Sequence, residues 1–592
     1  MPRALLAAQS LLLAVFVTWP MALRPGSAAL GSPNGDALKH VWNLWWMQAE
    51  WRSGAAGLHT ALINFPNGID LYPIELANGL LTAWTPLPPI LAANLLALLH
   101  VVLVGVCAGW LGWLLSERKS GALAAGALAQ VSAFTAFTLH AGVGELRLWW
   151  WIPLGLALGV RARSRQAPKD FVLLGLALAA ATLSCFYHGF FLAAAVATYA
   201  LATLKLERRL LLGYAGAAAL GLVIVVPVVR TFAHTYDPGA AHAAGSFFTY
   251  MQSGYPKDSY AVSSLKPLEL FTPDLQLSND PHARLEAYLG GRYLGFGAIL
   301  LAIAALRADR RRALPWLAVA AVGVMFALGN TLVYGGRIRW ILPLSPVNHV
   351  LSWFAEPLNF PVRFLAVTTV AVAALGAIAM RQRWVWVLVP LTMIDVTLND
   401  PVPWPRSSFF LPAVDDLQPP PGAVADLTWA EADDLVSTGK PVLATFDAQQ
   451  RSRSAAAQVM LDRPFATIPI ERVDHWATDG LAWTAATPLA RVLGKGHISS
   501  DALSSSAALF RARGFGSVLV THPCDGGAQQ NVEGLLTMVL GEPQRGRCGS
   551  LWTLPEGDAP PDLAQLQATV EADAARLHPP PIGDPDNGNG QP

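Results

Sequence analysis

Charged residues are scarce in this sequence. Only 14% of the 592 residues are Asp, Glu, Lys or Arg, and 53% are hydrophobic, whereas soluble domains carry about 25% charged residues. This composition and a mean hydropathy of +0.39 indicate an integral membrane protein. The net charge of +1 and the lack of a long basic run exclude nucleic acid as a partner.

Cysteine and the common catalytic motifs are also scarce. Four cysteines are too few for a disulfide framework. Cys107 and Cys185 lie in apolar stretches, so only Cys524 and Cys548 could pair usefully, and the sequence leaves that pairing open. There is no GxxxxGK(S/T) loop, HExxH motif, CxxC pair or GxSxG elbow. The usual markers of ATP-driven transport, zinc proteolysis and serine hydrolysis are therefore absent.

Long apolar stretches, in contrast, are abundant. We expect about eleven spans of roughly 17 to 25 residues, at 4–23, 89–115, 120–139, 145–161, 170–187, 189–205, 209–229, 292–307, 313–330, 363–380 and 384–399. The first is expected to be an uncleaved span and not a signal peptide, because many more follow.

Short junctions rich in Lys and Arg follow every second stretch, as at 117–119 and 381–383. The positive-inside rule therefore predicts a cytoplasmic N-terminus. The loops 24–88, 230–291 and 331–362, and everything after residue 400, are then extracytoplasmic.

The predicted fold class is mainly α, with a polytopic membrane helix bundle and a smaller extracytoplasmic α/β domain. The bundle and its loops occupy 1–400, a Pro-rich linker 401–421, and the α/β domain 422–578. Within that domain we expect strands at 441–446 and 516–521 and helices at 505–514 and 561–577. Residues 579–592 are too polar to stay ordered.

The stretch from Gly35 to Arg52 combines scarce polar groups with a run of tryptophans. At about 100° per residue, one stripe carries Asp36, Lys39, His40, Asn43 and Glu50. So many tryptophans are typical of a helix lying in a membrane interface. Asp36 could act there as a general base or cap the helix N-terminus, and the two roles are compatible.

Other polar side chains are predicted at the same face of the membrane. Lys39 and His40 could hold a phosphate or contact lipid headgroups. One turn carries His140, Glu145 and Arg147. These side chains could form a second wall of the site, or they could form an interfacial ion pair.

Two more polar residues lie at the ends of apolar stretches. His188 is costly to bury without a partner. Arg363 could clamp a phosphate or extend to the interface. The candidate substrate or phosphate ligands are therefore Lys39, His40, His140, Arg147, His188 and Arg363. Glu145 is, after Asp36, the second candidate catalytic residue.

Several short motifs resemble those of bacterial multi-span proteins similar to C-type (GT-C) glycosyltransferases, which use polyprenyl-phosphate sugars. They are Thr18-Trp19-Pro20, Gly35-Asp36, Trp42-Asn43-Leu44-Trp45-Trp46, Phe65-Pro66-Asn67-Gly68, Tyr187-His188-Gly189, Tyr293-Leu294-Gly295 and Pro361-Val362-Arg363-Phe364. The resemblance covers most of 1–400 and supports the fold better than the activity. The C-terminal part also resembles the soluble tail of such proteins.

In that class an acidic residue of the first extracytoplasmic loop is the catalytic base, which corresponds to Asp36, and a second acid corresponds to Glu145. The resemblance implies inverting transfer from a polyprenyl-phosphate-linked sugar in the bacterial inner (cytoplasmic) membrane, with membrane lipid as a second partner. It leaves a divalent metal open, because Ala37 stands where a second acid frequently follows. The alternative is a non-catalytic lipid-linked-glycan transporter or assembly scaffold of the cell envelope.

Overall fold

The computed structural model describes residues 3–577 with gaps. The longest gaps are 233–264, 273–290, 348–359, 428–447, 468–482, 490–499 and 523–529, and shorter ones include 33–35, 55–58, 71–74 and 204–206. The predicted strand at 441–446, the tail 579–592 and Cys524 lie outside the described residues. Cys548 is disulfide-bonded, whereas Cys107 and Cys185 are free thiols.

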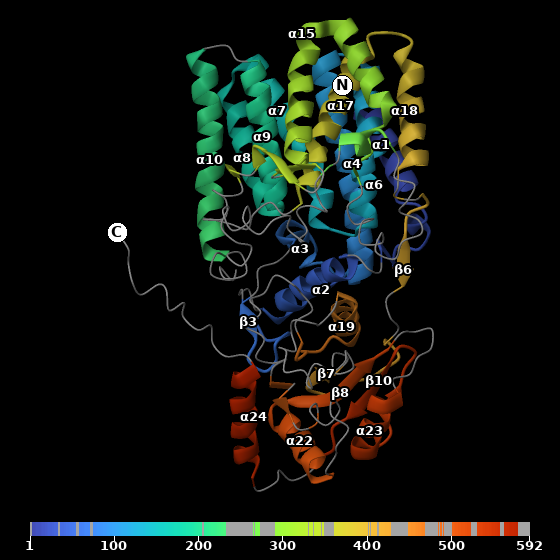
Figure 1. Ribbon diagram of the computed structural model, residues 1–592, viewed down its shortest axis with the longest axis vertical. Helices are drawn as coiled ribbons and strands as arrows, with labels where there is room; N and C mark the ends of the chain where they lie inside the picture. The colour runs from blue at the N-terminus through green and yellow to red at the C-terminus, as the bar shows by residue number, and fades with distance from the viewer. Residues whose placement is uncertain are drawn as a thin grey trace, which may run out of the picture.

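A bundle of roughly parallel helices forms the upper part of the molecule (Figure 1). It contains α1 (Arg3–Val17), α4 (Pro89–Ser116), α5 (Lys119–Gln130), α6 (Ala133–His140), α7 (Trp151–Arg165), α8 (Pro168–Ser184), α9 (Phe186–Ala202), α10 (Arg208–Phe232), α15 (Gly295–Ala327), α17 (Leu365–Ala379) and α18 (Val385–Asn399). Short 3-10 helices connect them, namely η1 (Met21–Leu23), η2 (Glu145–Trp150), η3 (Pro267–Leu270) and η6 (Pro361–Phe364).

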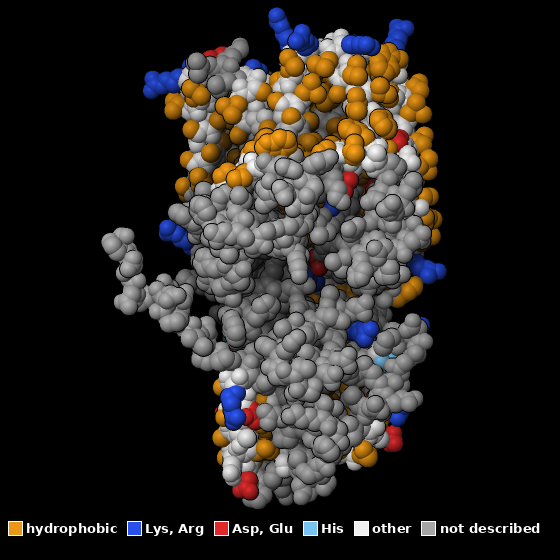
Figure 2. Space-filling model, in the orientation of Figure 1, with side chains coloured by type: hydrophobic (Ala, Val, Ile, Leu, Met, Phe, Trp, Pro, Cys, Tyr) orange, Lys and Arg blue, Asp and Glu red, His pale blue; other side chains and the backbone are white. Residues whose placement is uncertain are grey.

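The bundle has the surface of a membrane domain. Hydrophobic side chains cover much of its visible outer face, and Lys and Arg gather at its upper end (Figure 2). Four of its helical segments are long and apolar enough to cross a membrane by length and composition: Pro89–Ser116, Lys119–His140, Arg208–Val228 and Pro361–Ala379. The chain is therefore a membrane protein.

Each of the eleven predicted spans coincides with helical structure, although only these four described segments meet the length and hydropathy criteria. The stretches 292–307 and 313–330 lie in one helix, α15, with an extended residue at Asp309 inside it. Arg381 Nη1 donates to the Asp309 carboxylate at 2.8 Å, which ties this kink to the junction after α17.

Small residues let the central helices approach closely. Gly112 of α4 lies so near Ala125 of α5 that a Cβ on the glycine would be 2.6 Å from the alanine Cβ. On α17 nearly every side chain is buried. Membrane helices gain stability from such close backbone packing, because lipid supplies no hydrophobic drive between them.

The lower part of the molecule is a mixed sheet with helices against it (Figure 1). Its strand order is β7-β8-β10-β9, where only the β7 and β8 pair is parallel. The strands are β7 (Ala423–Asp426), β8 (Phe515–Thr521), β9 (Gln544–Arg545) and β10 (Gly549–Thr553), and the helices are α19 (Ala448–Leu461), α22 (Ser500–Ala512), α23 (Gln530–Leu540) and α24 (Leu563–Leu577). We call these elements the C-terminal unit. The strand and helices expected near 516, 505 and 561 are all present.

The tryptophan helix α2 (Ala37–Ser53) and the short α3 (Leu76–Thr82) lie between the bundle and the C-terminal unit (Figure 1). Trp42, Trp45 and Trp46 are buried in one apolar cluster with Ala455 of α19. The prediction that these tryptophans lie in the membrane interface is therefore wrong. Their indole rings are covered by protein. Helix periodicity shows that a face is apolar, but it does not show whether protein or lipid covers that face.

Indole N–H groups strengthen this contact. Trp42 Nε1 donates to Gln458 Oε1 at 2.8 Å, and Trp45 Nε1 donates to Asp462 Oδ1 at 2.8 Å. Buried indoles need such acceptors. The first loop and the C-terminal unit thus form a specific contact through α2.

Three two-stranded pairings complete the connections, all of them antiparallel. They are β1 (Ala28–Leu30) with β6 (Ser408–Phe410), β2 (His59–Thr60) with β3 (Ile69–Asp70), and β4 (Thr331–Tyr334) with β5 (Arg337–Ile341). The first pairing is unexpected, because β6 falls within the predicted Pro-rich linker 401–421. It joins the segment after α1, the first helix of the bundle, to the segment after α18, the last helix of the bundle.

Candidate functional site

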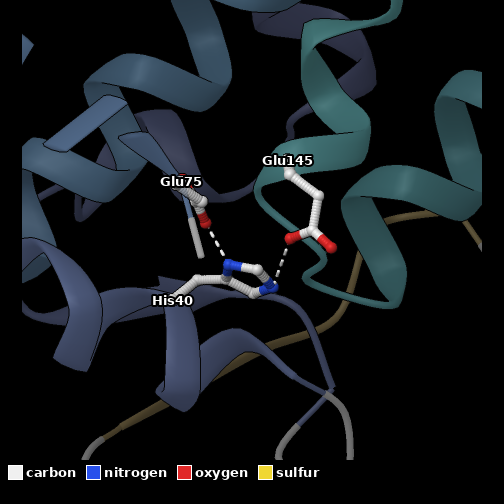
Figure 3. Close-up of side chains that lie close together, drawn as sticks. All are labelled: His40, Glu75 and Glu145. Atoms are coloured by element: carbon white, nitrogen blue, oxygen red, sulfur yellow. Dashed lines mark ion pairs between the residues drawn. The ribbon is translucent and has the colours of Figure 1, made fainter. Parts of the chain in front are cut away.

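Two acidic side chains and a histidine from three separate segments lie close together (Figure 3). His40 lies on the first turn of α2, Glu75 directly precedes α3, and Glu145 is the first residue of η2. All three are buried. We call this group the His40 cluster.

Both nitrogens of the His40 ring face a carboxylate. Nδ1 forms an ion pair with Glu75 Oε1, and Nε2 lies 3.3 Å from Glu145 Oε2. The second oxygen of Glu75 accepts a hydrogen bond from Asn78 Nδ2 at 2.6 Å. Arg147 adds another positive charge that acts on Glu75. Two carboxylates therefore face two cations in a buried space.

The carboxylates of the cluster favour the charged form of His40. Burial alone would lower the pKa of the imidazole, but the carboxylates of Glu75 and Glu145 outweigh burial and raise this pKa above its ordinary value of 6.5. Burial also opposes the charge of Glu75. Its ion pair with His40 and the hydrogen bond from Asn78 prevail, so the pKa of this carboxyl falls below 4.5.

The same three residues offer a donor set for a divalent cation. One ligand atom of each lies within 4.8 Å of the others, and imidazole nitrogen with carboxylate oxygens suits zinc. A proton on His40 and a metal ion would be alternative occupants, because both act on the same lone pairs. The metal that the sequence left open thus has a candidate place at residues other than Asp36.

Glycines allow the three segments to approach. Gly142 has a φ of +72° and packs on Ala37 at the start of α2, and a Cβ at Gly144 would lie 1.8 Å from Glu75 Oε1. Any larger residue at Gly144 must displace that carboxylate. The Gly142-Val143-Gly144 turn is therefore what brings Glu145 beside the other two side chains.

Asp36 lies at the rim of the His40 cluster. Its side chain is 24% exposed and forms an ion pair with Lys39 Nζ at 3.0 Å, while its charge also acts on His40. The carboxylate makes no cap hydrogen bond to the first turn of α2, a turn that the structure describes in full. The N-cap expected as the competing role of Asp36 is therefore absent.

Two predicted phosphate ligands instead hold the segments together. Arg147 is buried and donates from Nη2 to the Leu30 carbonyl at 3.2 Å. His140 Nδ1 lies 3.0 Å from Ser407 Oγ. Both contacts anchor the turn around Glu145 to the β1 and β6 pairing.

Arg363 and His188 form a second polar pair, inside the bundle. The Arg363 guanidinium stacks on the rings of Phe360 and Tyr187, at 4.1 and 4.9 Å from their centroids. It is buried, and Nε and Nη1 have no hydrogen-bond partner among the described residues. His188 is fully buried in the same situation, and Arg363 acts on it electrostatically.

One residue connects the Arg363 pair to the His40 cluster electrostatically. The charges of Glu145 and Arg363 both act on the thiol of Cys185. Asp36, Lys39 and His40 approach this region from α2.

Sequence reasoning found His40 and Glu145 but missed Glu75. This residue is preceded by a turn-rich stretch without periodicity, so no pattern singled it out. The available signal was its isolation, because Glu75 is the sole acidic residue between Asp70 and Glu117. An isolated acid close to a long apolar span, here the one that begins at residue 89, is a candidate for a buried partner.

No known family profile and no curated protein matches this sequence. The chain is similar to the solved structure of the Archaeoglobus fulgidus oligosaccharyltransferase in the apo form, with 12% identity, a TM-score of 0.41, and coverage of 90% of this chain and 71% of that chain. It is also similar to the structure of the same protein in complex with Zn and sulfate, with 12% identity, a TM-score of 0.39, and coverage of 88% of this chain and 67% of that chain. A third similar structure is that of ArnT from Cupriavidus metallidurans bound to undecaprenyl phosphate, with 14% identity, a TM-score of 0.38, and coverage of 94% of this chain and 99% of that chain.

Proposed function

We propose that this chain is an integral-membrane glycosyltransferase that moves a sugar from a polyprenyl-phosphate donor to an extracytoplasmic acceptor, which is a glycan, a lipid or a protein. The observation that carries the proposal is the position of Asp36, a partly exposed carboxylate at the rim of a buried, charge-balanced cluster.

Asp36 is the proposed general base. Glu75 and Glu145 are buried and both face His40, so neither is open to an acceptor hydroxyl. Asp36 retains exposed surface, and Lys39 and His40 fix its surroundings. A base must come within hydrogen-bond reach of the proton it removes, and the exposed surface of Asp36 supports this role over Glu75 and Glu145.

The Arg363 pair is the proposed holder of the donor phosphate. A buried guanidinium with hydrogen-bond donors to spare is costly without an anion, and a phosphate accepts two parallel hydrogen bonds from this group. His188 can add a further contact. Aromatic rings below the guanidinium keep its plane in place.

The proposed reaction inverts the configuration of the sugar. The acceptor oxygen forms a bond to the anomeric carbon while the bond from that carbon to the phosphate oxygen breaks. Asp36 takes the acceptor proton, and the lipid phosphate leaves with the bonding electron pair. Arg363 stabilises the charge that develops on the phosphate.

The test uses the full chain in liposomes with a set of labelled polyprenyl-phosphate sugars. Asp36→Asn should lower kcat about a hundredfold or more, because loss of a general base typically has this effect. Arg363→Lys should raise KM for the donor. Asp562→Asn, an exposed aspartate next to α24, is the matched control and should leave transfer unchanged.

Two results would contradict the proposal. Full transfer by Asp36→Asn would remove the assigned base. Donor binding without transfer under every condition would favour the non-catalytic transporter or scaffold.

A further inference from the structure

We infer that His100 and Asn78 are positioning residues of the His40 cluster, and that a one-way chain of hydrogen bonds starting at Trp150 fixes the Glu75 carboxylate against His40. This inference deepens the proposed function, on which its catalytic consequence rests. It concerns side chains that the sequence did not single out.

The chain of contacts runs through four side chains. Trp150 Nε1 donates to His100 Nδ1 at 3.1 Å, and His100 Nε2 lies 2.8 Å from Asn78 Oδ1. Asn78 Nδ2 then donates to Glu75 Oε2 at 2.6 Å. The other oxygen of Glu75 meets His40 Nδ1.

The two ends of the chain fix the same direction for every hydrogen bond in it, because the Trp150 indole can only donate and the ionised Glu75 carboxylate can only accept. An indole N–H can only donate, so His100 Nδ1 must accept and the ring proton must sit on Nε2. Asn78 Oδ1 then accepts that proton, which leaves the amide nitrogen of Asn78 to face the carboxylate. Each group has one arrangement, and the carboxylate of Glu75 is held in one orientation.

Burial makes this arrangement rigid. His100, Asn78 and Glu75 are each 1 to 2% exposed, so water cannot replace a lost partner. A buried donor or acceptor left unpaired is destabilised by the full cost of its desolvation. A complete network in such a place specifies one geometry, whereas a broken one does not.

The residues of this hydrogen-bond chain come from four different elements. His100 is on α4, Trp150 ends η2, Asn78 is on α3 and His40 is on α2. The hydrogen bonds therefore link a membrane helix to the helix that carries Asp36. Through them, the bundle sets the position of the His40 ring and of the rim above it.

The experiment observes the histidine rings directly. The full chain, labelled with ¹⁵N at histidine and reconstituted in lipid, is studied by solid-state NMR, with His40 and His100 assigned from His40→Asn and His100→Gln. In the unaltered protein, His100 should show one protonated nitrogen, Nε2, and His40 should show an Nδ1–H strongly deshielded by Glu75.

Two matched pairs of variants separate hydrogen bonding from packing. Trp150→Phe should shift the ¹⁵N signal of His100 Nδ1, because that nitrogen loses its hydrogen-bond donor, whereas Trp151→Phe should not. Trp151 stacks on Trp150 at 4.1 Å, but its own N–H has no hydrogen-bond partner among the described residues. His100→Phe should shift the His40 Nδ1 signal, and His100→Gln should restore it, because an amide can accept from Trp150 and donate to Asn78.

Transfer activity is the second measurement. His100→Phe should lower kcat about tenfold or more while leaving the donor KM unchanged, as loss of an outer-shell partner typically does. Should His100→Phe fail to fold, Asn78→Leu and Trp150→Phe serve in its place.

An unchanged His40 signal in His100→Phe, or equal behaviour of His100→Phe and His100→Gln, would overturn the inference. If the NMR results hold but the unaltered protein transfers no sugar, the positioning role stands and the proposed function fails.

Discussion

His40 carries the charge on which the surrounding acidic residues depend. Its raised pKa and the lowered pKa of Glu75 are two sides of one buried ion pair. Buried pairs add little net stability when intact, but removing one partner typically costs about 3–5 kcal/mol. Substitutions in the cluster are therefore expected to act through the partner that is left behind.

The pKa directions give the cluster a defined pH range. The contribution of His40 is fully present below 6.5 and is lost as pH rises through the higher pKa of the folded state. The contribution of Glu75 is present above 4.5 and is lost as pH falls through its lower folded pKa. Both contributions are complete between these two values.

Glu75→Gln should therefore lower the apparent melting temperature most between pH 4.5 and 6.5, with a loss of about 3 kcal/mol. The gap from the unaltered protein should narrow on both sides of this range. Thermal unfolding across pH measures it. Glu117→Gln, whose side chain is 73% exposed, is the control and should show no such dependence, and a pH-independent gap in Glu75→Gln would contradict the assignment.

Individual site residues were only partly predictable from the sequence. Asp36, His40 and Glu145 stood out because polar groups are rare near long apolar stretches. Their pairing did not, because His40 meets Glu75 and Glu145 only through the folding of loops far apart in sequence. Arg147 and His140 looked like phosphate ligands for the same reason, yet their described partners are Leu30 and Ser407.

Among the elements, the short η2 and the turn before it bring the site together. The glycines of this turn give the Glu145 backbone room to approach α2 and α3. Gly144 is the tightest point, since it abuts the carboxylate of Glu75.

Gly144→Ala should displace Glu75 and destabilise the protein by on the order of 3 kcal/mol, as the loss of a buried partner does. Gly159→Ala on α7 is the control, because its new Cβ would meet Val196 at an ordinary 4.0 Å. Thermal unfolding and transfer rate are the measurements. In a Glu75→Ala background the Gly144→Ala change should cost little, and full additivity would contradict a mechanism through Glu75.

Helices were the most predictable elements. Hydropathy located helical structure at every expected span, because the bilayer requires long apolar runs. What hydropathy missed is how a helix is covered. The tryptophans of α2 have the composition of a membrane-interface helix, but α19 covers them, and nothing in the sequence near residue 40 indicates a partner near residue 455.

For the whole molecule, the contact between α2 and α19 joins the membrane bundle to the C-terminal unit. Gln458 is its central residue, fully buried and accepting from Trp42 while its amide faces the carbonyls of Leu62 and Arg463. Helix α2, which begins directly after Asp36, is thereby bound to α19 of the C-terminal unit.

Gln458→Ala should loosen α2 and lower both stability, by about 1–3 kcal/mol for a buried group left unpaired, and transfer. Hydrogen exchange of the 37–53 backbone should rise in this variant. Gln567→Ala, on the exposed face of α24, is the control and should leave that exchange unchanged. Unchanged exchange in Gln458→Ala would show that the C-terminal unit does not support α2.

The pairing of β1 with β6 also sets an order of events during synthesis. β1 leaves the ribosome directly after the first helix, but β6 follows only after α18, and α19 later still. Chains grow at about 5–20 residues per second, so the apolar face of α2 stays uncovered while most of the protein is made. A nascent chain that ends before β6 and α19 lacks the strand that pairs with β1 and the helix that covers α2, so the surroundings of the His40 cluster are complete only after the last helix of the bundle, α18, has been made.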